Sequence, residues 1–260
     1  MVDLSLGLQL YSVREDFKKD YEKTLREVSE MGYEAVEFAG LFDAKPEDIQ
    51  KLCNELNILP ISAHLGVDLN CEDYESLLLP YGKIGCQYLV VPWVDSTWLP
   101  GEEGFSDFDK YMGKISETSK KLGMKLCYHN HEFELGLKDG KTYLDALYEI
   151  YPKDILQSEL DLCWIAFAGY NPVEYLERYK ARSEIVHIKD FYSKKVGCSR
   201  EEAEFEFRPV GKGNLDTKAI LDTVKRNNCR YLIVEQDHPT PGKTALECAD
   251  ESIEFIKSNI

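Results

Sequence analysis

The sequence predicts a single α/β domain, a (β/α)8 barrel over residues 1–260, and three observations lead to this prediction. Short apolar runs alternate with amphipathic segments of helical spacing, which is typical of parallel strands joined by helices. Eight such pairs follow one another without a linker between them. The length of 260 residues suits a one-domain barrel. A doubly wound open sheet is the structural alternative, but it usually has fewer units and no GxGxxG follows the first strand.

The eight predicted strands are short runs rich in Leu, Ile, Val and aromatic residues. In chain order they span residues 4–10, 34–38, 59–64, 88–92, 125–129, 156–161, 185–189 and 231–235. The run at 156–161 is the weakest, because LQSELD contains more polar than apolar residues.

Eight predicted helices follow these strands, and glycine or proline marks several of their ends. Gly32, Gly85 and Gly123 end three of them, and Pro46 stands at the first position of another. The helices span residues 21–31, 46–56, 74–84, 107–122, 142–150, 172–179, 216–227 and 244–257. A polar insertion at about 191–213 separates the seventh strand from its helix.

Charge and apolar content exclude several classes of partner. The chain has 47 acidic and 31 basic residues, a net charge of −16, and no basic cluster, so a nucleic-acid partner is not expected. Its apolar runs are far shorter than the roughly 20 residues that cross a bilayer. No signal peptide is recognisable at the N-terminus, so we expect a cytoplasmic protein without a membrane partner.

The eight cysteines show no C-x-x-C spacing and are expected to be reduced.

Polar residues gather at the predicted strand ends, which is where catalytic groups lie in such barrels. Four of the five histidines stand there: His64, His129, His131 and His187. Asp161 ends the sixth strand, Lys189 the seventh and Glu235 the eighth. The structural alternatives are an N-cap for Asp161 and a solvent-directed chain for Lys189. Glu235 is harder to explain structurally, because an unpaired buried charge is costly.

Side-chain alternation places several of these groups on one rim of the barrel. If His129, Asp161, His187 and Glu235 all point inward, two imidazoles and two carboxylates converge there. Mixed nitrogen and oxygen ligands suit Mn, Co, Zn or Fe(II), and a catalytic site keeps open positions for substrate. We therefore expect one divalent metal ion, with Mn, Co, Zn and Mg as the candidates.

Several motifs taken together resemble the sugar phosphate isomerase/epimerase family of xylose-isomerase-like TIM barrels, which is related to inosose dehydratases and keto-sugar lyases. The resemblance covers nearly the whole chain. Its motifs are LGLQLYSVR (6–14), GYEAVEFAG (32–40), SAHLG (62–66), YHNHEFE (128–134), ELDLCW (159–164), HIKDF (187–191), VGKGNLD (210–216) and VEQD (234–237).

The resemblance implies a metal bound by a Glu, an Asp, a His and a Glu at the ends of strands five to eight. Asp161, His187 and Glu235 match the last three of these ligands. Where many relatives read E-N-H, this chain has His129 followed by Asn130 and a second histidine. We therefore assign the fifth-strand ligand to His129, with Glu132 as the fallback.

The implied chemistry is proton abstraction α to a carbonyl, with an enediolate intermediate. Glu235, His129 and Lys189 are the expected catalytic residues, with Glu235 as base and Lys189 stabilising negative charge. The resemblance favours a sugar isomerase or epimerase acting on a ketose or keto-polyol. The loss of a symmetric pair of glutamates at His129 favours the alternative, a dehydratase or β-eliminating lyase on a keto-sugar or inosose. A non-catalytic carbohydrate-binding barrel is the second alternative.

A small sugar or keto-polyol is the expected partner, and six residues are expected to contact it. They are Glu37, His64, Trp93, His131, Trp164 and Arg208, and His131 is alternatively a residue that orients a metal ligand. VGKGNLD is not a Walker motif, so a substrate phosphate is not expected. The net charge and the few histidines argue against an abasic-site endonuclease, which the same barrel also hosts. Acidic barrels of this size often pair, so a homodimer is a further expectation.

Overall fold

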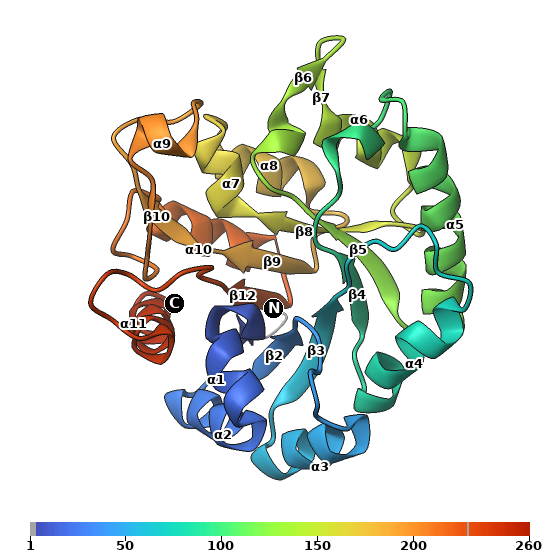
Figure 1. Cartoon of the computed structure of the whole chain (residues 1–260). Coiled ribbons are helices and arrows are strands. Elements are labelled where there is room, and N and C mark those ends of the chain that lie inside the picture. The colour runs from blue at the N-terminus through green and yellow to red at the C-terminus, as the bar shows by residue number, and fades with distance from the viewer. Residues whose placement is uncertain (1–3, 228) are drawn as a thin grey trace.

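The structure is a computed structural model that describes residues 4–227 and 229–260, and it is a closed barrel of eight parallel strands (Figure 1). The strand order around the barrel is β1-β12-β9-β8-β5-β4-β3-β2. The strands are β1 (Ser5–Gln9), β2 (Ala35–Phe38), β3 (Leu59–His64), β4 (Tyr88–Val91), β5 (Lys125–His129), β8 (Gln157–Asp161), β9 (Ile185–Ile188) and β12 (Tyr231–Val234). The predicted fold class is confirmed, and each strand lies where the sequence predicts it.

Helices surround the barrel and bury their apolar faces against the strands (Figure 1). Gly32 (φ 90°) and Gly85 (φ 105°) adopt the left-handed conformation that ends α2 and α4, as predicted. Thr244 and Glu247 form a capping box at the start of the last helix. The helices are α1 (Arg14–Lys19), α2 (Tyr21–Met31), α3 (Pro46–Leu56), α4 (Tyr74–Ile84), α5 (Phe105–Lys121), α6 (Tyr143–Ile150), α7 (Leu162–Phe167), α8 (Pro172–Tyr179), α9 (Arg200–Ala203), α10 (Thr217–Arg226) and α11 (Ala245–Lys257).

The loops that follow the strands carry short elements that the sequence did not reveal. They are the 3-10 turns η1 (Leu10–Val13), η2 (Ser96–Trp98) and η3 (Phe133–Leu135), the helices α1 and α7, and a hairpin of β6 (Leu137–Lys138) and β7 (Lys141–Thr142). The hairpin projects beyond the ring of helices in Figure 1.

The insertion after β9 folds against the barrel mouth. It contains an antiparallel pair, β10 (Asp190–Tyr192) and β11 (Glu206–Arg208), with α9 between them. The predicted insertion is polar in composition, yet Phe191 and Phe207 are buried in a small apolar cluster with Trp164. The carboxylate of Asp190 accepts hydrogen bonds from four backbone N–H groups, those of Phe191, Gly211, Gly213 and Leu215. One buried side chain therefore holds both ends of the insertion.

The barrel interior changes from apolar to polar toward the C-terminal ends of the strands. The apolar part consists of Ala35, Ile61, Tyr88, Val90, Cys127, Ile185, Tyr231 and Ile233. Above these residues along the strands lie buried polar side chains, among them Gln9, Glu37 and Glu159. All eight cysteines are free thiols, as predicted. Among the described residues, no helix has the length and apolar character that a membrane span requires.

Candidate active site

A cavity of about 330 Å³ opens at the C-terminal ends of the barrel strands. Its lining comes from the ends of β1, β2, β3, β4, β5, β9 and β12 and from the loops that follow them. The lining residues are Tyr11, Ala39, His64, Pro92, Trp93, His129, His131, Lys189, Glu235 and Asp237. Six of the residues predicted for the site are therefore brought together at one mouth.

Four predicted metal ligands form a compact set of donors beside this cavity. One ligand atom from each of His129, Asp161, His187 and Glu235 lies within 4.8 Å of those of the others. His187 Nδ1 is 2.9 Å from Glu235 Oε2, and His129 Nε2 is 3.5 Å from Asp161 Oδ2. All four side chains are buried. Two imidazoles and two carboxylates fit a divalent transition metal better than Ca²⁺, which prefers oxygen ligands.

The two carboxylate oxygens of Asp161 have different surroundings. Oδ1 accepts hydrogen bonds from the backbone N–H groups of Cys163 and Trp164 and so caps α7. Oδ2 is buried and accepts no hydrogen bond, but Lys189 Nζ lies 3.2 Å and His129 Nε2 3.5 Å from it. The N-cap interpretation and the ligand interpretation are thus compatible, since each uses a different oxygen. The mixed imidazole and carboxylate chemistry of the donor set, rather than an unpaired oxygen, is therefore the observation that fits a bound cation.

Lys189 places a positive charge against the same carboxylates. Its Nζ lies 2.9 Å from Glu235 Oε2, 3.2 Å from Asp161 Oδ2 and 3.0 Å from Asp237 Oδ1. Burial opposes this charge, but the three carboxylates outweigh it and hold the pKa of Lys189 well above its usual value. The side chain is buried, so it does not extend to solvent.

Burial and nearby charges shift the pKa values of the two rim carboxyls, Asp161 and Glu235, in opposite directions. Burial raises the pKa of Asp161 to about 6, although Lys189 and His187 oppose this shift. Burial also acts on Glu235, but Lys189 and His187 outweigh it and lower the pKa of that carboxyl. Glu235 is therefore ionised at neutral pH while Lys189 is protonated.

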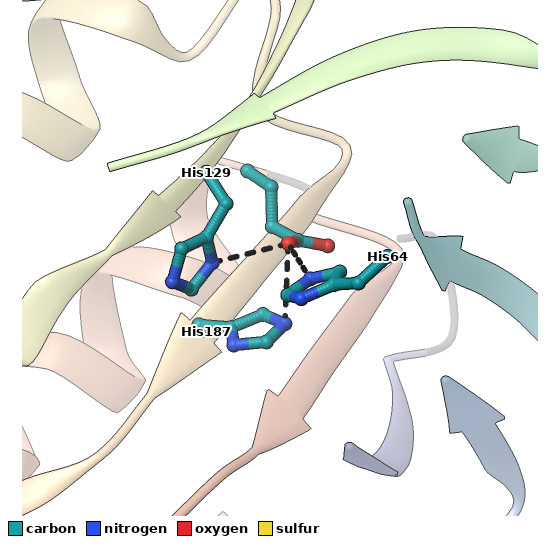
Figure 2. A group of neighbouring side chains, drawn as sticks. His64, His129 and His187 are labelled. Atoms are coloured by element: carbon teal, nitrogen blue, oxygen red, sulfur yellow. Dashed lines mark hydrogen bonds and ion pairs between the residues drawn. The ribbon is translucent and has the colours of Figure 1, made fainter. Parts of the chain in front are cut away.

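A second group of buried polar side chains lies beneath the donors. Figure 2 shows His64, His129 and His187 converging on one carboxylate oxygen, which is Oε2 of Glu159. The distances from this oxygen are 2.8 Å to His64 Nε2, 3.2 Å to His129 Nδ1 and 3.3 Å to His187 Nε2. Glu37 Oε1 lies 3.0 Å from His64 Nε2 and 2.6 Å from His187 Nε2.

Sequence reasoning missed Glu159, although a signal was available. Glu159 stands two residues before Asp161 in β8, so the two carboxylates share one face of that strand.

His131 lies at the cavity as a neutral imidazole. Its ring stacks on Trp164 and Phe133, with centroids 5.7 and 5.9 Å away. Its backbone N–H donates to Glu134 Oε2 at 2.7 Å. Burial lowers the pKa of His131 to about 3, with a further contribution from Lys189. Nδ1 of this ring is buried without a hydrogen-bond partner.

Three residues predicted to contact substrate do not line the cavity. Glu37 is fully buried beneath it, and Trp164 is covered by the guanidinium of Arg200 at 4.2 Å. Arg208 lies in the insertion and donates to the carbonyl of Phe207. These positions leave His64, His131 and Trp93 as the predicted contacts that face the cavity.

The fallback ligand Glu132 is engaged elsewhere. Its two carboxylate oxygens accept hydrogen bonds from Arg200 Nε and Nη2 at 2.7 and 3.0 Å. This pair joins the loop after β5 to α9 of the insertion. The group of neighbouring donors contains His129 and not Glu132.

Comparison with known proteins gives the same fold and family. A sequence relative named inosose dehydratase, from Clostridium perfringens, is 23% identical over 91% of this chain and 89% of its own length. A solved sugar phosphate isomerase/epimerase from Parabacteroides distasonis has a TM-score of 0.79 at 20% identity, with 96% of each chain covered. A structure described as the IOLI protein with a binding zinc atom has a TM-score of 0.73 at 18% identity, covering 98% of this chain and 99% of its own.

The comparisons agree with two expectations from the sequence. The other curated relatives that match also carry the name inosose dehydratase. Relatives with these names are enzymes, as the sequence predicts for this chain. The family model described as xylose isomerase-like TIM barrel matches residues 25–259. The chain therefore belongs to the xylose isomerase-like TIM barrel family.

Proposed function

We propose that the protein is a lyase that removes water from a keto-polyol of the inosose type. The observation that carries the proposal is the pair of Glu235 and Lys189, which lines the cavity with Oε2 and Nζ 2.9 Å apart. One member accepts a proton and the other donates one, as a β-elimination requires. The name of the curated relatives supports dehydration over the isomerisation or epimerisation that the sequence placed first.

The elimination uses both side chains in turn. The C–H bond α to the substrate carbonyl breaks, and its proton goes to the ionised Glu235. The electron pair forms a C=C bond as the β C–O bond breaks. The departing hydroxide takes a proton from Lys189 and leaves as water. Proton transfer from Glu235 to Lys189 across 2.9 Å then restores both groups.

A divalent cation fits the donor set of His129, Asp161, His187 and Glu235. Bound there, the ion would polarise the substrate carbonyl and so make the adjacent C–H bond more acidic. The zinc atom of the structural neighbour supports a transition metal in this barrel. Zn, Mn and Co all accept this mixture of nitrogen and oxygen ligands.

The cavity matches a small, uncharged, hydroxylated substrate. Its volume of about 330 Å³ lies at the lower end of ligand pockets. Trp93, with half of its surface exposed, and Tyr11 offer apolar walls to sugar C–H faces. Among the described lining residues Lys189 is the one long-chain cation, and three carboxylates already neutralise it. These features support an unphosphorylated substrate.

The test is the incubation of the metal-supplemented protein with an inosose, with NMR detection of the dehydrated product. Glu235→Gln is expected to lose turnover by at least about 100-fold, because general base catalysis typically contributes 10²–10⁴-fold. Glu184→Gln is the matched control, since Glu184 precedes β9 at the opposite end of the barrel and pairs with Lys125. Full activity in Glu235→Gln would refute the assignment. Epimerisation of a ketose without loss of water would restore the isomerase alternative, and binding without turnover would favour the carbohydrate-binding alternative.

A further inference from the structure

The two histidines of the donor set each have carboxylates on both sides of the ring. His129 turns Nε2 toward Asp161 at 3.5 Å and Nδ1 toward Glu159 at 3.2 Å. His187 turns Nδ1 toward Glu235 at 2.9 Å and Nε2 toward Glu37 at 2.6 Å. In each ring one nitrogen therefore faces the cavity rim, and the other faces the barrel interior.

The interior carboxylates are themselves held in place. His64 Nε2 lies between them, 3.0 Å from Glu37 Oε1 and 2.8 Å from Glu159 Oε2. Gln9 Nε2 donates to Glu37 Oε1 at 2.7 Å, and Gln9 Oε1 accepts the backbone N–H of Tyr11 at 2.9 Å. We call Gln9, Glu37, His64 and Glu159 the carboxylate floor. Because four different strands supply these residues, the floor is fixed by the barrel itself.

We propose that Glu159 and Glu37 are positioning residues that determine which ring nitrogens of His129 and His187 bind the cation. A neutral imidazole has one N–H donor and one lone pair. When His129 donates Nδ1–H to Glu159, its Nε2 lone pair faces Asp161. When His187 donates Nε2–H to Glu37, its Nδ1 lone pair faces Glu235. The inference rests on the cation site of the proposed function but not on the dehydration reaction.

The same distances raise a competing interpretation, a second ion within the floor. Ligand atoms of His64, His129, Glu159 and His187 also lie within 4.8 Å of one another. Both sets of donors, however, include His129 and His187. Two ions bound together would require each shared imidazole to lose its one remaining N–H proton and bridge them as an imidazolate. The geometry therefore favours one ion at the rim, with the floor accepting the remaining N–H groups.

The first experiment measures Co²⁺ binding by competition with a chromophoric chelator and by visible absorption. We expect Glu159→Gln and Glu37→Gln to bind one ion per chain with affinity lowered roughly 10–100-fold, as is typical when the carboxylate partner of a metal-bound histidine is removed. The visible spectrum of bound Co²⁺ is expected to change, because the orientation of an imidazole ligand changes. Glu184→Gln, the same replacement at the far end of the barrel, is expected to match wild type in both readouts.

The second experiment reads the ring nitrogens directly and needs no variant. In the Zn²⁺-loaded wild-type protein, ¹⁵N NMR of the histidine side chains is expected to show His129 protonated at Nδ1 and His187 protonated at Nε2. This measurement keeps the proposal testable if a floor variant fails to fold, which circular dichroism would show.

Three results would overturn the proposal. They are unchanged affinity and spectrum in both floor variants, the opposite protonation in either ring, and two ions per chain with one lost in Glu159→Gln. None of these readouts requires turnover. A protein that shows the expected binding but dehydrates no inosose would refute the proposed reaction and leave the floor intact.

Discussion

Glu134 offers a quantitative link between pH and stability. Burial raises the pKa of this carboxyl from 4.5 to about 7, although hydrogen bonds from Tyr128 and the backbone of His131 oppose the shift. A raised folded-state pKa means that folding favours the protonated carboxyl. The stabilisation is complete below pH 4.5 and is lost as the pH rises through 7. At about 1.4 kcal/mol per pKa unit, the loss from this one group is about 3 kcal/mol.

Glu134→Gln removes this titration and keeps a side chain of similar shape. Its amide oxygen still accepts the backbone N–H of His131, and its amide N–H₂ donates to the Tyr128 hydroxyl oxygen. We expect the free energy of unfolding of the variant, relative to wild type, to rise by about 2.5 kcal/mol between pH 5 and pH 8. Urea denaturation of both proteins across this pH range measures the difference in unfolding free energy. The contributions of the ionisable groups that both proteins share cancel in this difference. Parallel pH profiles would show that Glu134 does not titrate with a raised pKa.

Two further predictions concern Lys189 and the insertion. Lys189→Met leaves the carboxylates of the rim without their cation, so the metal-free variant is expected to lose on the order of 3–5 kcal/mol of unfolding free energy. Because those carboxylates remain, Mn²⁺ is expected to raise the Tm of this variant more than that of wild type. An equal rise would show that Lys189 does not neutralise these carboxylates in the wild-type protein. Gly213→Ala places a Cβ 2.2 Å from Asp190 Oδ1 and 2.4 Å from the carbonyl oxygen of Phe191. We expect this variant to lose about 1–3 kcal/mol and to be cleaved faster by protease within residues 190–215, whereas an unchanged Tm would contradict the close contact.

The barrel could be predicted from sequence because its elements are defined by local chemistry. Helices predicted at 46–56 and 74–84 coincide with α3 and α4, whose ends are marked by Pro46 and Gly85. The long helix predicted from residue 107 begins instead at Phe105, because no strong N-cap precedes it and Gly104 takes that place without a side-chain hydrogen bond. Such boundaries depend on packing as much as on residue type.

The site was predicted less completely, because part of it depends on contacts between distant strands. The four candidate metal donors could be predicted because each lies at a strand end or within one residue of it. Alternation places Glu159 on the same face of β8 as Asp161, but its contacts with His64 from β3 and His129 from β5 follow only from the fold. Trp164 was expected to contact substrate, but the insertion folds over it and Arg200 covers its ring. No local pattern in the sequence gives these long-range contacts.

The hydrogen bonds of Asp190 also affect how the sequence of the insertion can change during evolution. Both ends of the segment that follows β9 are hydrogen-bonded to this one carboxylate, next in sequence to Lys189. The stretch between the anchored ends can lengthen, shorten or change composition while β9 and Lys189 at its end keep their place. Closing a longer loop costs little extra entropy once its ends are fixed. Changes in the sequence of this stretch are therefore expected to leave Lys189 and the cavity lining in place.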